Sequence, residues 1–188
     1  PFDAAKLIRE QGYKAIARPV GKSDEMVIVS SAKGDIKVLS DLKAGASIAM
    51  ADNRDVKLIG LRLLEAVDLS ENDVKFEITE TYQAAAKQVA QGTVDAGFFI
   101  AEIYHSLSNL TRMQLNVLIE SDLADITHVV LAKSEFAGAD TVRDVLLALK
   151  DDADGQAVLA ELGMPNGFEA VSEEEAEFMI YLMETLLD

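Results

Sequence analysis

Residues 76–101, FEITETYQAAAKQVAQGTVDAGFFIA, hold the pattern of strand, helix and strand that decides the fold. The first residues alternate apolar and charged side chains, as in a half-buried strand. Small apolar residues then recur at helical spacing, and Gly92 is of the type that ends helices in a left-handed turn. A second apolar run covers residues 94–100. The stretch predicts a βαβ unit whose helix is capped by the hydroxyl of Thr79 or Thr81.

The rest of the chain alternates predicted strands and helices in the same way, which indicates the α/β class with a largely parallel sheet. The predicted strands are residues 13–19, 26–30, 47–51, 114–119 and 126–132. The predicted helices are residues 3–11, 56–66, 141–150 and 153–162, with a last helix opening at a Ser172–Glu175 capping box. The polar loop GKSDE, residues 21–25, is expected to be hairpin-like.

Composition excludes several classes of protein. The chain has 188 residues, of which 49% are hydrophobic, enough for one or two small folded domains. Its net charge of −16 argues against nucleic acid and anionic membranes as partners. The absence of cysteine excludes disulfides and thiolate zinc sites, and no apolar run is long enough to span a membrane. The opening PFDAAKLIRE is helical rather than a signal peptide, as expected of a cytoplasmic, mature or shortened chain.

The sequence also lacks the motifs of common catalytic sites, namely GxSxG, HExxH, the P-loop and GxGxxG. The only histidines, His105 and His128, stand apart and are interpreted as packing or surface residues rather than metal ligands. We therefore expect no enzyme, no cofactor and no metal.

Four segments together resemble the phosphate/phosphonate branch of the type 2 periplasmic solute-binding proteins that serve ABC transporters. They are AAAKQVAQGTVDAGF at 84–98, KVLSDLKAGASIAM at 37–50, THVVLAKS at 127–134 and TVRDVLLALKDDADGQAVLAELG at 141–163. Their order along the chain is more specific than any one of them.

The resemblance implies a periplasmic-binding-protein-like type 2 fold with two α/β lobes and parallel or mixed sheets. Residues 31–105 would form a complete lobe two. Residues 1–30 and 106–188 would form lobe one, joined to it by two crossover strands that we place within 20–32 and 102–113. Lobe one is expected to be incomplete, because family members carry a further stretch before the point where this chain starts.

The first loop that the resemblance places at the ligand cleft follows the strand at 47–51. Backbone N–H groups at a helix start form a ready anion site. Asn53 can donate to an oxyanion and Arg54 can clamp it with two bonds, whereas Asp52 and Asp55 would repel it. The family's Ser or Thr hydroxyls are missing here. The alternative is that Asp52 or Asn53 serves only as a helix N-cap.

The second loop, around Thr79, Thr81 and Tyr82, opens the next helix. Thr81 and Tyr82 can replace the donors that the family has there, or they can be a helix cap and a packed ring. Asp95 matches the Asp of the family's VDA motif, so it would contact an amine-bearing ligand or hold the cleft floor; a structural bond to backbone is the alternative. The loop at residues 120–122 is expected to line the cleft too.

The function that these features imply is non-catalytic capture of a small solute, a phosphate- or phosphonate-like oxyanion or another small anion. Hinge closure of two lobes would hold the ligand for ABC-type uptake. The implied partners are that ligand and a transporter permease, in the periplasm or on an extracytoplasmic lipid anchor. The alternative is a binding-protein-like sensor or interaction domain without a transport cleft, which would be expected to form a homodimer.

Overall fold

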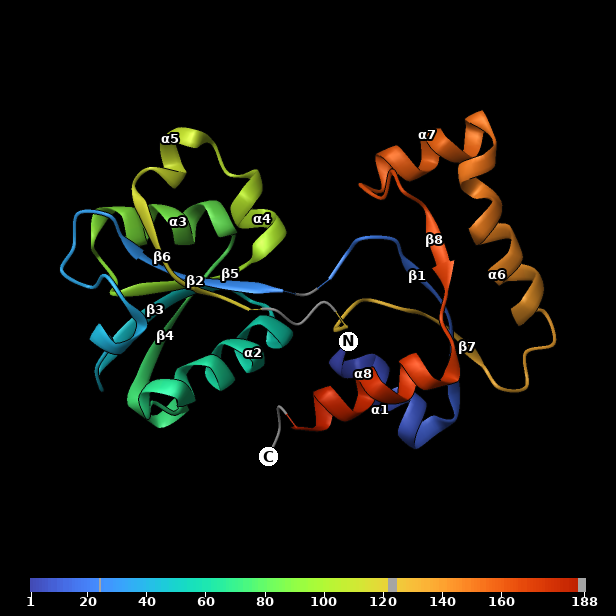
Figure 1. The fold of residues 1–188 in the computed structure, drawn as a ribbon, viewed down its shortest axis with the longest axis horizontal. Helices are drawn as coiled ribbons and strands as arrows, with labels where there is room; N and C mark the ends of the chain where they lie inside the picture. Colours follow the sequence, from blue (N-terminus) through green and yellow to red (C-terminus); the bar gives the residue numbers. More distant parts are fainter. Residues whose placement is uncertain (24, 122–124, 186–188) are drawn as a thin grey trace. The chain divides into compact units, whose positions relative to one another are not determined.

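The computed structural model describes residues 1–23, 25–121 and 125–185 (Figure 1). The chain divides into two compact units. Unit 1 consists of Pro1–Ser23 and Leu123–Asp188, and unit 2 of Asp24–Asp122. Among the described residues, no helix is long and apolar enough to cross a membrane.

Unit 2 is built on a five-stranded sheet in the order β4-β3-β5-β2-β6. Its strands are β2 (Met26–Ser31), β3 (Ala46–Ala51), β4 (Val74–Thr79), β5 (Ala96–Ile100) and β6 (Leu115–Glu120). β3 runs parallel to β4 and β5, whereas β2 is antiparallel to β5 and β6. The sheet is therefore mixed: β3, β4, β5 and β6 run in one direction and β2 runs against them, so the prediction of a largely parallel sheet holds for this sheet except at β2.

Helices cover both faces of this sheet (Figure 1). They are α2 (Arg54–Leu64), α3 (Tyr82–Gln91), α4 (Ala101–Ser106) and α5 (Asn109–Arg112), with 3₁₀ turns η1 (Leu39–Asp41), η2 (Glu65–Val67) and η3 (Glu71–Asp73). α2 lies on one face, and α3 and α4 lie on the other. The predicted βαβ unit is present as β4-α3-β5, but its two strands are not neighbours, because β3 lies between them.

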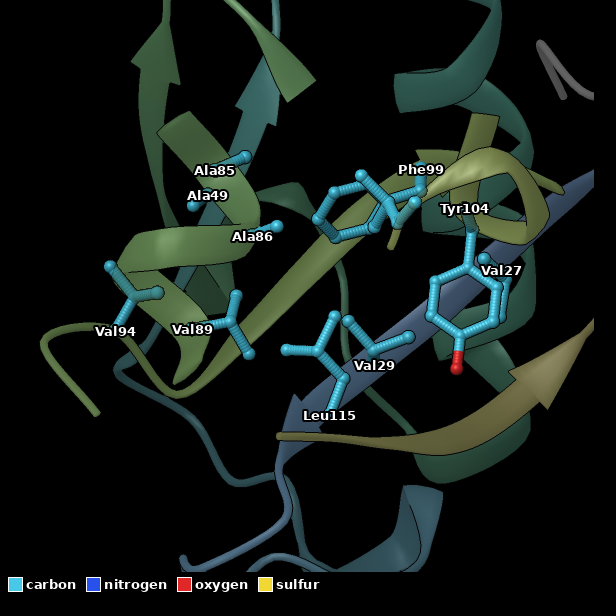
Figure 2. Packing of buried hydrophobic residues seen from close by; sticks show 11 residues of the cluster. Val27, Val29, Ala49, Ala85, Ala86, Val89, Val94, Phe99, Tyr104 and Leu115 are labelled. Atoms are coloured by element: carbon cyan, nitrogen blue, oxygen red, sulfur yellow. The ribbon is translucent and has the colours of Figure 1, made fainter. Parts of the chain in front are cut away.

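The small residues of α3 allow close packing on the sheet. Ala85, Ala86 and Val89 are fully buried against Val29 and Phe99 of the sheet (Figure 2). Because alanine projects so little, the helix axis can approach the strands and exclude water from this face. The dense contact fixes α3, and with it the start of the helix, relative to β4 and β5.

Both ends of α3 follow from its sequence. The hydroxyl of Thr81 accepts a bond from the Ala84 N–H at 3.1 Å, so Thr81 is the N-cap. Gly92 ends the helix at φ 68°, a left-handed conformation that glycine adopts without steric cost. The predicted helix and its stop are confirmed.

Unit 1 is built on an antiparallel sheet in the order β7-β1-β8. Its strands are β1 (Tyr13–Pro19), β7 (Val130–Lys133) and β8 (Phe168–Ala170). Its helices are α1 (Phe2–Gln11), α6 (Ala139–Ala148), α7 (Ala153–Glu161) and α8 (Glu173–Thr185), with the 3₁₀ turn η4 (Leu149–Asp151). A core of Ala17, Leu159 and Phe168 joins the sheet to the α6–α7 segment.

Three expectations about connections need revision. The loop GKSDE is not a hairpin, because β1 and β2 belong to different sheets. The strand predicted at 126–132 is observed only as β7, since Thr127 is held instead by its hydroxyl, which donates to the Lys22 carbonyl at 2.7 Å. The predicted lobe 31–105 leaves out β2 and β6, which the structure pairs within the sheet of unit 2.

The predicted capping box at the start of α8 is confirmed. The Ser172 N–H donates to Glu175 Oε2 at 2.8 Å, and the Glu175 N–H donates to Ser172 Oγ at 3.2 Å. Arg18 of β1 donates to Glu169 of β8 and to Glu175 at 2.6 and 2.9 Å. The bonds from Ser172, with the nearby Arg18, hold the pKa of Glu175 below its ordinary value.

This lowered pKa predicts an acid-sensitive contribution to stability. A carboxyl whose pKa is lower in the folded state stabilises the fold above its unfolded pKa of about 4.3, and loses that effect as pH falls through the folded value. Glu175→Gln keeps an oxygen that can accept from Ser172 but does not titrate. We expect the wild-type free energy of unfolding to fall more than that of the variant between about pH 5 and pH 3.

Urea denaturation followed by circular dichroism at each pH measures this difference. Glu174→Gln, on the same first turn of α8, is the matched control and should follow the wild type. Equal acid dependence in wild type and Glu175→Gln would show that this carboxylate contributes no acid-sensitive stability.

A second prediction concerns the contact of α2 with the sheet. A Cβ at Gly60 would lie closer than van der Waals contact to the ring of Phe98, which is fully buried and packs on Phe76. Gly60→Ala gains about 1 kcal/mol in helix propensity but overpacks the core at a cost of about 1–3 kcal/mol. We expect a net loss of about 1 kcal/mol in urea denaturation. Gly34→Ala, whose Cβ would lie 3.5 Å from Ser31, should cost less; a Gly60→Ala protein as stable as wild type would contradict the close contact.

Candidate functional site

The carboxyl ends of β3 and β4 bring two helix starts to the same edge of the sheet. These strands are parallel neighbours, and their last residues, Ala51 and Thr79, are paired in register. β3 leads into α2 and β4 leads into α3. Because both helices begin directly after adjacent parallel strands, their positive N-terminal ends share this edge. We refer to residues 52–55 and 79–83 as the helix-start edge.

Asn53 is the N-cap of α2. Its Oδ1 accepts a bond from the Val56 N–H at 3.1 Å, and its carbonyl accepts from the Lys57 N–H. Of the two residues expected as possible N-caps, Asp52 and Asn53, it is Asn53 that caps the helix. An acceptor role for Oδ1 leaves the amide NH₂ of the same side chain as a donor toward a ligand. Capping and ligand binding are thus compatible in this residue.

Thr81 and Thr79 differ in what their hydroxyls can offer. Thr81 Oγ1 accepts from the Ala84 N–H, so its own proton can be donated outward. Thr79 Oγ1 donates to the carbonyls of Met50 and Thr81 at 3.1 and 3.0 Å. These two carbonyls share the single proton of the hydroxyl, so Thr79 has no further proton to donate to a ligand. Its bond to the Met50 carbonyl joins the end of β4 to the end of β3.

Tyr82 contributes packing at this edge. Its ring lies against Phe99, with ring centroids 5.9 Å apart, and is partly buried on the α3 side of the core. The packed-ring alternative therefore describes the aromatic part of Tyr82.

The charges at the helix-start edge are mixed. Arg54 is the first residue of α2 and is exposed, so its guanidinium adds positive charge next to the helix N-terminus. Asp52 is exposed in the loop, and Asp55 lies half-buried in the first turn of α2. Glu80 is exposed just before the N-cap of α3. These carboxylates suit the helix dipole but oppose an anion, so an anionic ligand must be held by short-range donors.

Asp95 lies at the other end of the strands. It directly precedes β5, and its Oδ2 accepts bonds from the N–H and the hydroxyl of Ser47, each at 2.8 Å. The Asp95 N–H in turn donates to Ser47 Oγ at 3.1 Å. Ser47 is the second residue of β3, so Asp95 and the helix-start edge are separated by nearly the whole strand. The hydrogen bonds between Asp95 and Ser47 join the starts of β3 and β5. Of the two roles considered for Asp95, ligand contact or a structural bond to backbone, these bonds are of the structural kind.

Two further sequence expectations can be placed. Ser121 of the 120–122 loop is buried, and its hydroxyl accepts a hydrogen bond from the Met26 N–H at 2.8 Å, which joins the loop to the start of β2. Asp122 lies outside the described residues. His105 is exposed and contacts Glu120 at 2.8 Å. Within the described ranges, no group of three His, Cys, Asp or Glu residues is arranged to hold a metal ion.

Sequence reasoning missed Ser47 as the partner of Asp95. The two residues are 48 positions apart, and no local pattern connects them. The only signal in the sequence was an acidic residue at the start of an apolar strand, which needs a partner when strands pack around it.

Solved structures with this fold include several solute-binding proteins. A Xanthomonas citri protein bound to chloride ion superposes with a TM-score of 0.77 at 16% identity, covering 100% of this chain and 76% of its own. PhnD1 of Prochlorococcus marinus in complex with methylphosphonate gives 0.70 at 15% identity, covering 96% and 74%. The periplasmic aliphatic sulphonate binding protein SsuA of Escherichia coli gives 0.68 at 20% identity, covering 98% and 67%. The fold is that of a type 2 periplasmic binding protein.

The family model described as "ABC transporter, phosphonate, periplasmic substrate-binding protein" matches residues 1–176. A search of curated protein sequences gives no significant match. The chain belongs to the family of phosphonate-binding periplasmic proteins of ABC transporters, and its function is solute binding without catalysis. Membership implies a small-molecule ligand and a permease partner.

The geometry around Asp95 predicts a structural effect. Asp95→Ala and Ser47→Ala should each lower the free energy of unfolding by about 1 kcal/mol, because each removes hydrogen bonds to a charged group on the surface. The double variant should cost less than the sum, since both changes remove the same interaction.

Urea denaturation of the four proteins of this cycle measures the coupling. The expected coupling is about 0.5–1 kcal/mol. Additive losses would show that Asp95 and Ser47 act independently and would remove the structural explanation for Asp95.

Proposed function

We propose that the chain binds a small oxyanion, namely a phosphonate, phosphate or sulfonate, at the helix-start edge of unit 2. The observation that carries the proposal is that two capped helices, α2 and α3, begin after the paired ends of the neighbouring parallel strands β3 and β4. Each N-terminus carries partial positive charge and free N–H donors, so two of them at the same edge of the sheet favour an anion there.

The side chains at this edge supply donors suited to tetrahedral oxyanions. The amide of Asn53 and the hydroxyl of Thr81 can each donate one bond while continuing to cap their helices. The guanidinium of Arg54 can reach an oxyanion with two parallel bonds. Thr79 and Tyr82 hold the edge in shape, and we assign Asp95 no contact with the ligand.

The comparisons support the ligand class. The description of the matching family names phosphonate as the transported substrate. Solved structures of the same fold include a complex with methylphosphonate and an aliphatic sulphonate binding protein. As part of the same proposal, the chain works in the periplasm, closes by a hinge on its solute and delivers it to an ABC permease. In this proposal it is not an enzyme, because the family to which it belongs is described as substrate-binding proteins of a transporter.

A thermal-shift screen tests the ligand class. The ligands are phosphate, methylphosphonate, aminoethylphosphonate, an alkanesulfonate, sulfate and several carboxylates. A ligand that binds only the folded protein stabilises it by mass action and so raises the melting temperature. At a free ligand concentration a hundred times the dissociation constant, the free energy of unfolding rises by about 2.7 kcal/mol. We expect a shift with at least one oxyanion and none with the carboxylates. A folded protein that responds to none of them would contradict the proposal.

The structure predicts a sharper test at Asn53. Asn53→Asp keeps the Oδ oxygen that caps α2, and Asp and Asn are about equal as N-caps, so stability should change by less than about 0.5 kcal/mol. The substitution replaces the amide donor by a negative charge beside the ligand. We expect the affinity for the oxyanion, measured by calorimetry, to fall more than about tenfold.

Asn72→Asp is the matched control. Asn72 is exposed in η3, which directly precedes β4, so the same change of charge is made at the opposite end of that strand. Affinity should then stay within about twofold of wild type, because exposed charges farther apart than about 8–10 Å are screened. Equal losses in both variants would indicate a general charge effect and would remove Asn53 from the site.

A further inference from the structure

The chain passes between the two units twice. It goes from unit 1 to unit 2 between residues 23 and 24, and it returns between residues 122 and 123. These two passages are the connections through which one unit of the chain can turn against the other. The described residues beside them show how the two connecting segments, around residues 22–26 and 121–127, are held to each other.

On the unit 2 side, Ser121 and Met26 join the two segments. The Ser121 N–H donates to the Met26 carbonyl at 2.8 Å, and the Met26 N–H donates to Ser121 Oγ at 2.8 Å. The antiparallel pairing of β2 with β6 reaches Val27↔Glu120, so Met26 and Ser121 occupy the next opposed positions. A regular ladder would give the Met26 N–H a backbone carbonyl as acceptor. Here the hydroxyl of the opposite residue takes that place.

On the unit 1 side, Thr127 and Lys22 join the same two segments. Thr127 Oγ1 donates to the Lys22 carbonyl at 2.7 Å, and both residues belong to unit 1. The same hydroxyl lies 3.3 Å from the carbonyl of its neighbour His128, so the bond to Lys22 is the shorter of the two. Each unit therefore holds the two segments together at its own side of the passages.

Both of these hydroxyls are buried. Among the described residues, the buried polar side chains are Ser30, Ser31, Ser121 and Thr127. Burying a hydroxyl costs free energy unless it is hydrogen-bonded, and Ser121 and Thr127 are each bonded to the opposite connecting segment. Two of the four therefore lie beside the passages between the units.

We propose that Ser121 and Thr127 are positioning residues that limit how the two units turn against each other. Both passages lie between the Ser121–Met26 and Thr127–Lys22 contacts, so neither connecting segment can twist without the other. Fewer open orientations leave a larger fraction of molecules ready to close on a ligand, and the apparent affinity rises with that fraction. The link to affinity rests on the proposed function, but neither residue is assigned a contact with the oxyanion.

The first test measures the distance between the units in the ligand-free chain. The chain has no cysteine, so Lys87→Cys in α3 and Glu161→Cys in α7 give one labelling site in each unit. Both positions are exposed. Double electron–electron resonance between nitroxide labels at these sites gives the distribution of distances. The labelled chain without further changes is the reference.

Two substitutions remove the contacts with little change of shape. Ser121→Ala and Thr127→Val delete only the hydroxyl or replace it by a methyl group, and each should widen the distribution. Thr127→Ser keeps a hydroxyl that can donate to the Lys22 carbonyl and should restore the reference distribution.

Ser30→Ala is the matched control. Ser30 is 1% exposed and donates to the Ile36 carbonyl at 2.7 Å, near the end of β2 that lies away from the passage. This variant loses a buried hydroxyl of the same kind, so it separates a general loss of stability from an effect on the two units. Its distance distribution should match the reference.

The second test measures the affinity for methylphosphonate by calorimetry. We expect Ser121→Ala and Thr127→Val to weaken binding by about three- to tenfold, because a smaller fraction of molecules is ready to close. Ser30→Ala and Thr127→Ser should stay within about twofold of wild type.

Three outcomes would overturn the proposal. These are unchanged distance distributions in Ser121→Ala and Thr127→Val, equal widening in Ser30→Ala, or failure of Thr127→Ser to restore the reference. Because the distances are measured without ligand, they decide the role of the two hydroxyls even for a chain that binds no oxyanion. Oxyanion binding that is equal in all variants would leave the site in place and remove Ser121 and Thr127 as positioning residues.

Discussion

The parallel pairing of β3 with β4 and β5 is the constraint on which the candidate site depends. It is held at one end by Asp95, which receives two bonds from Ser47, and at the other by Thr79, which donates to the Met50 carbonyl. With register held at both ends, the last residues of β3 and β4 stay level, and α2 and α3 begin at the same edge of the sheet. A slip of one residue would turn every side chain of a strand to the opposite face. The buried α3 packing would then be lost together with the helix-start edge.

A net charge of −16 does not exclude an anionic ligand at this edge. At physiological ionic strength the Debye length is about 8 Å, so most surface carboxylates are screened from the site. The charges that matter are those of Asp52, Arg54, Asp55 and Glu80, together with the two helix dipoles. The acidic surface therefore slows the approach of an anion while leaving its bound state to local donors. A site of this kind selects by hydrogen-bond geometry more than by charge.

Local spacing predicted the elements of the fold better than their arrangement. Helix caps depend on residues close together in the sequence, so they can be predicted from it. The structure shows the predicted N-cap Thr81, the stop at Gly92 and the Ser172–Glu175 capping box. The order of the strands depends on contacts between distant segments, so the sequence alone did not reveal β3 between β4 and β5 or the Ser47–Asp95 bond. The same limit explains Asp95: its match to a family motif suggested a ligand contact, whereas its partner was hidden 48 residues away.

The packing of unit 1 leaves some of its apolar side chains exposed. Its three-stranded sheet shares a core of Ala17, Leu159 and Phe168 with the α6–α7 segment, yet α6 has no fully buried residue and exposes Val142 and Val145. Unit 1 therefore has apolar surface beside β7 that its own elements leave partly uncovered. Each 100 Å² of apolar surface that is removed from water contributes about 2.5 kcal/mol to stability, so this exposed surface is stabilisation that unit 1 does not gain from its own contacts.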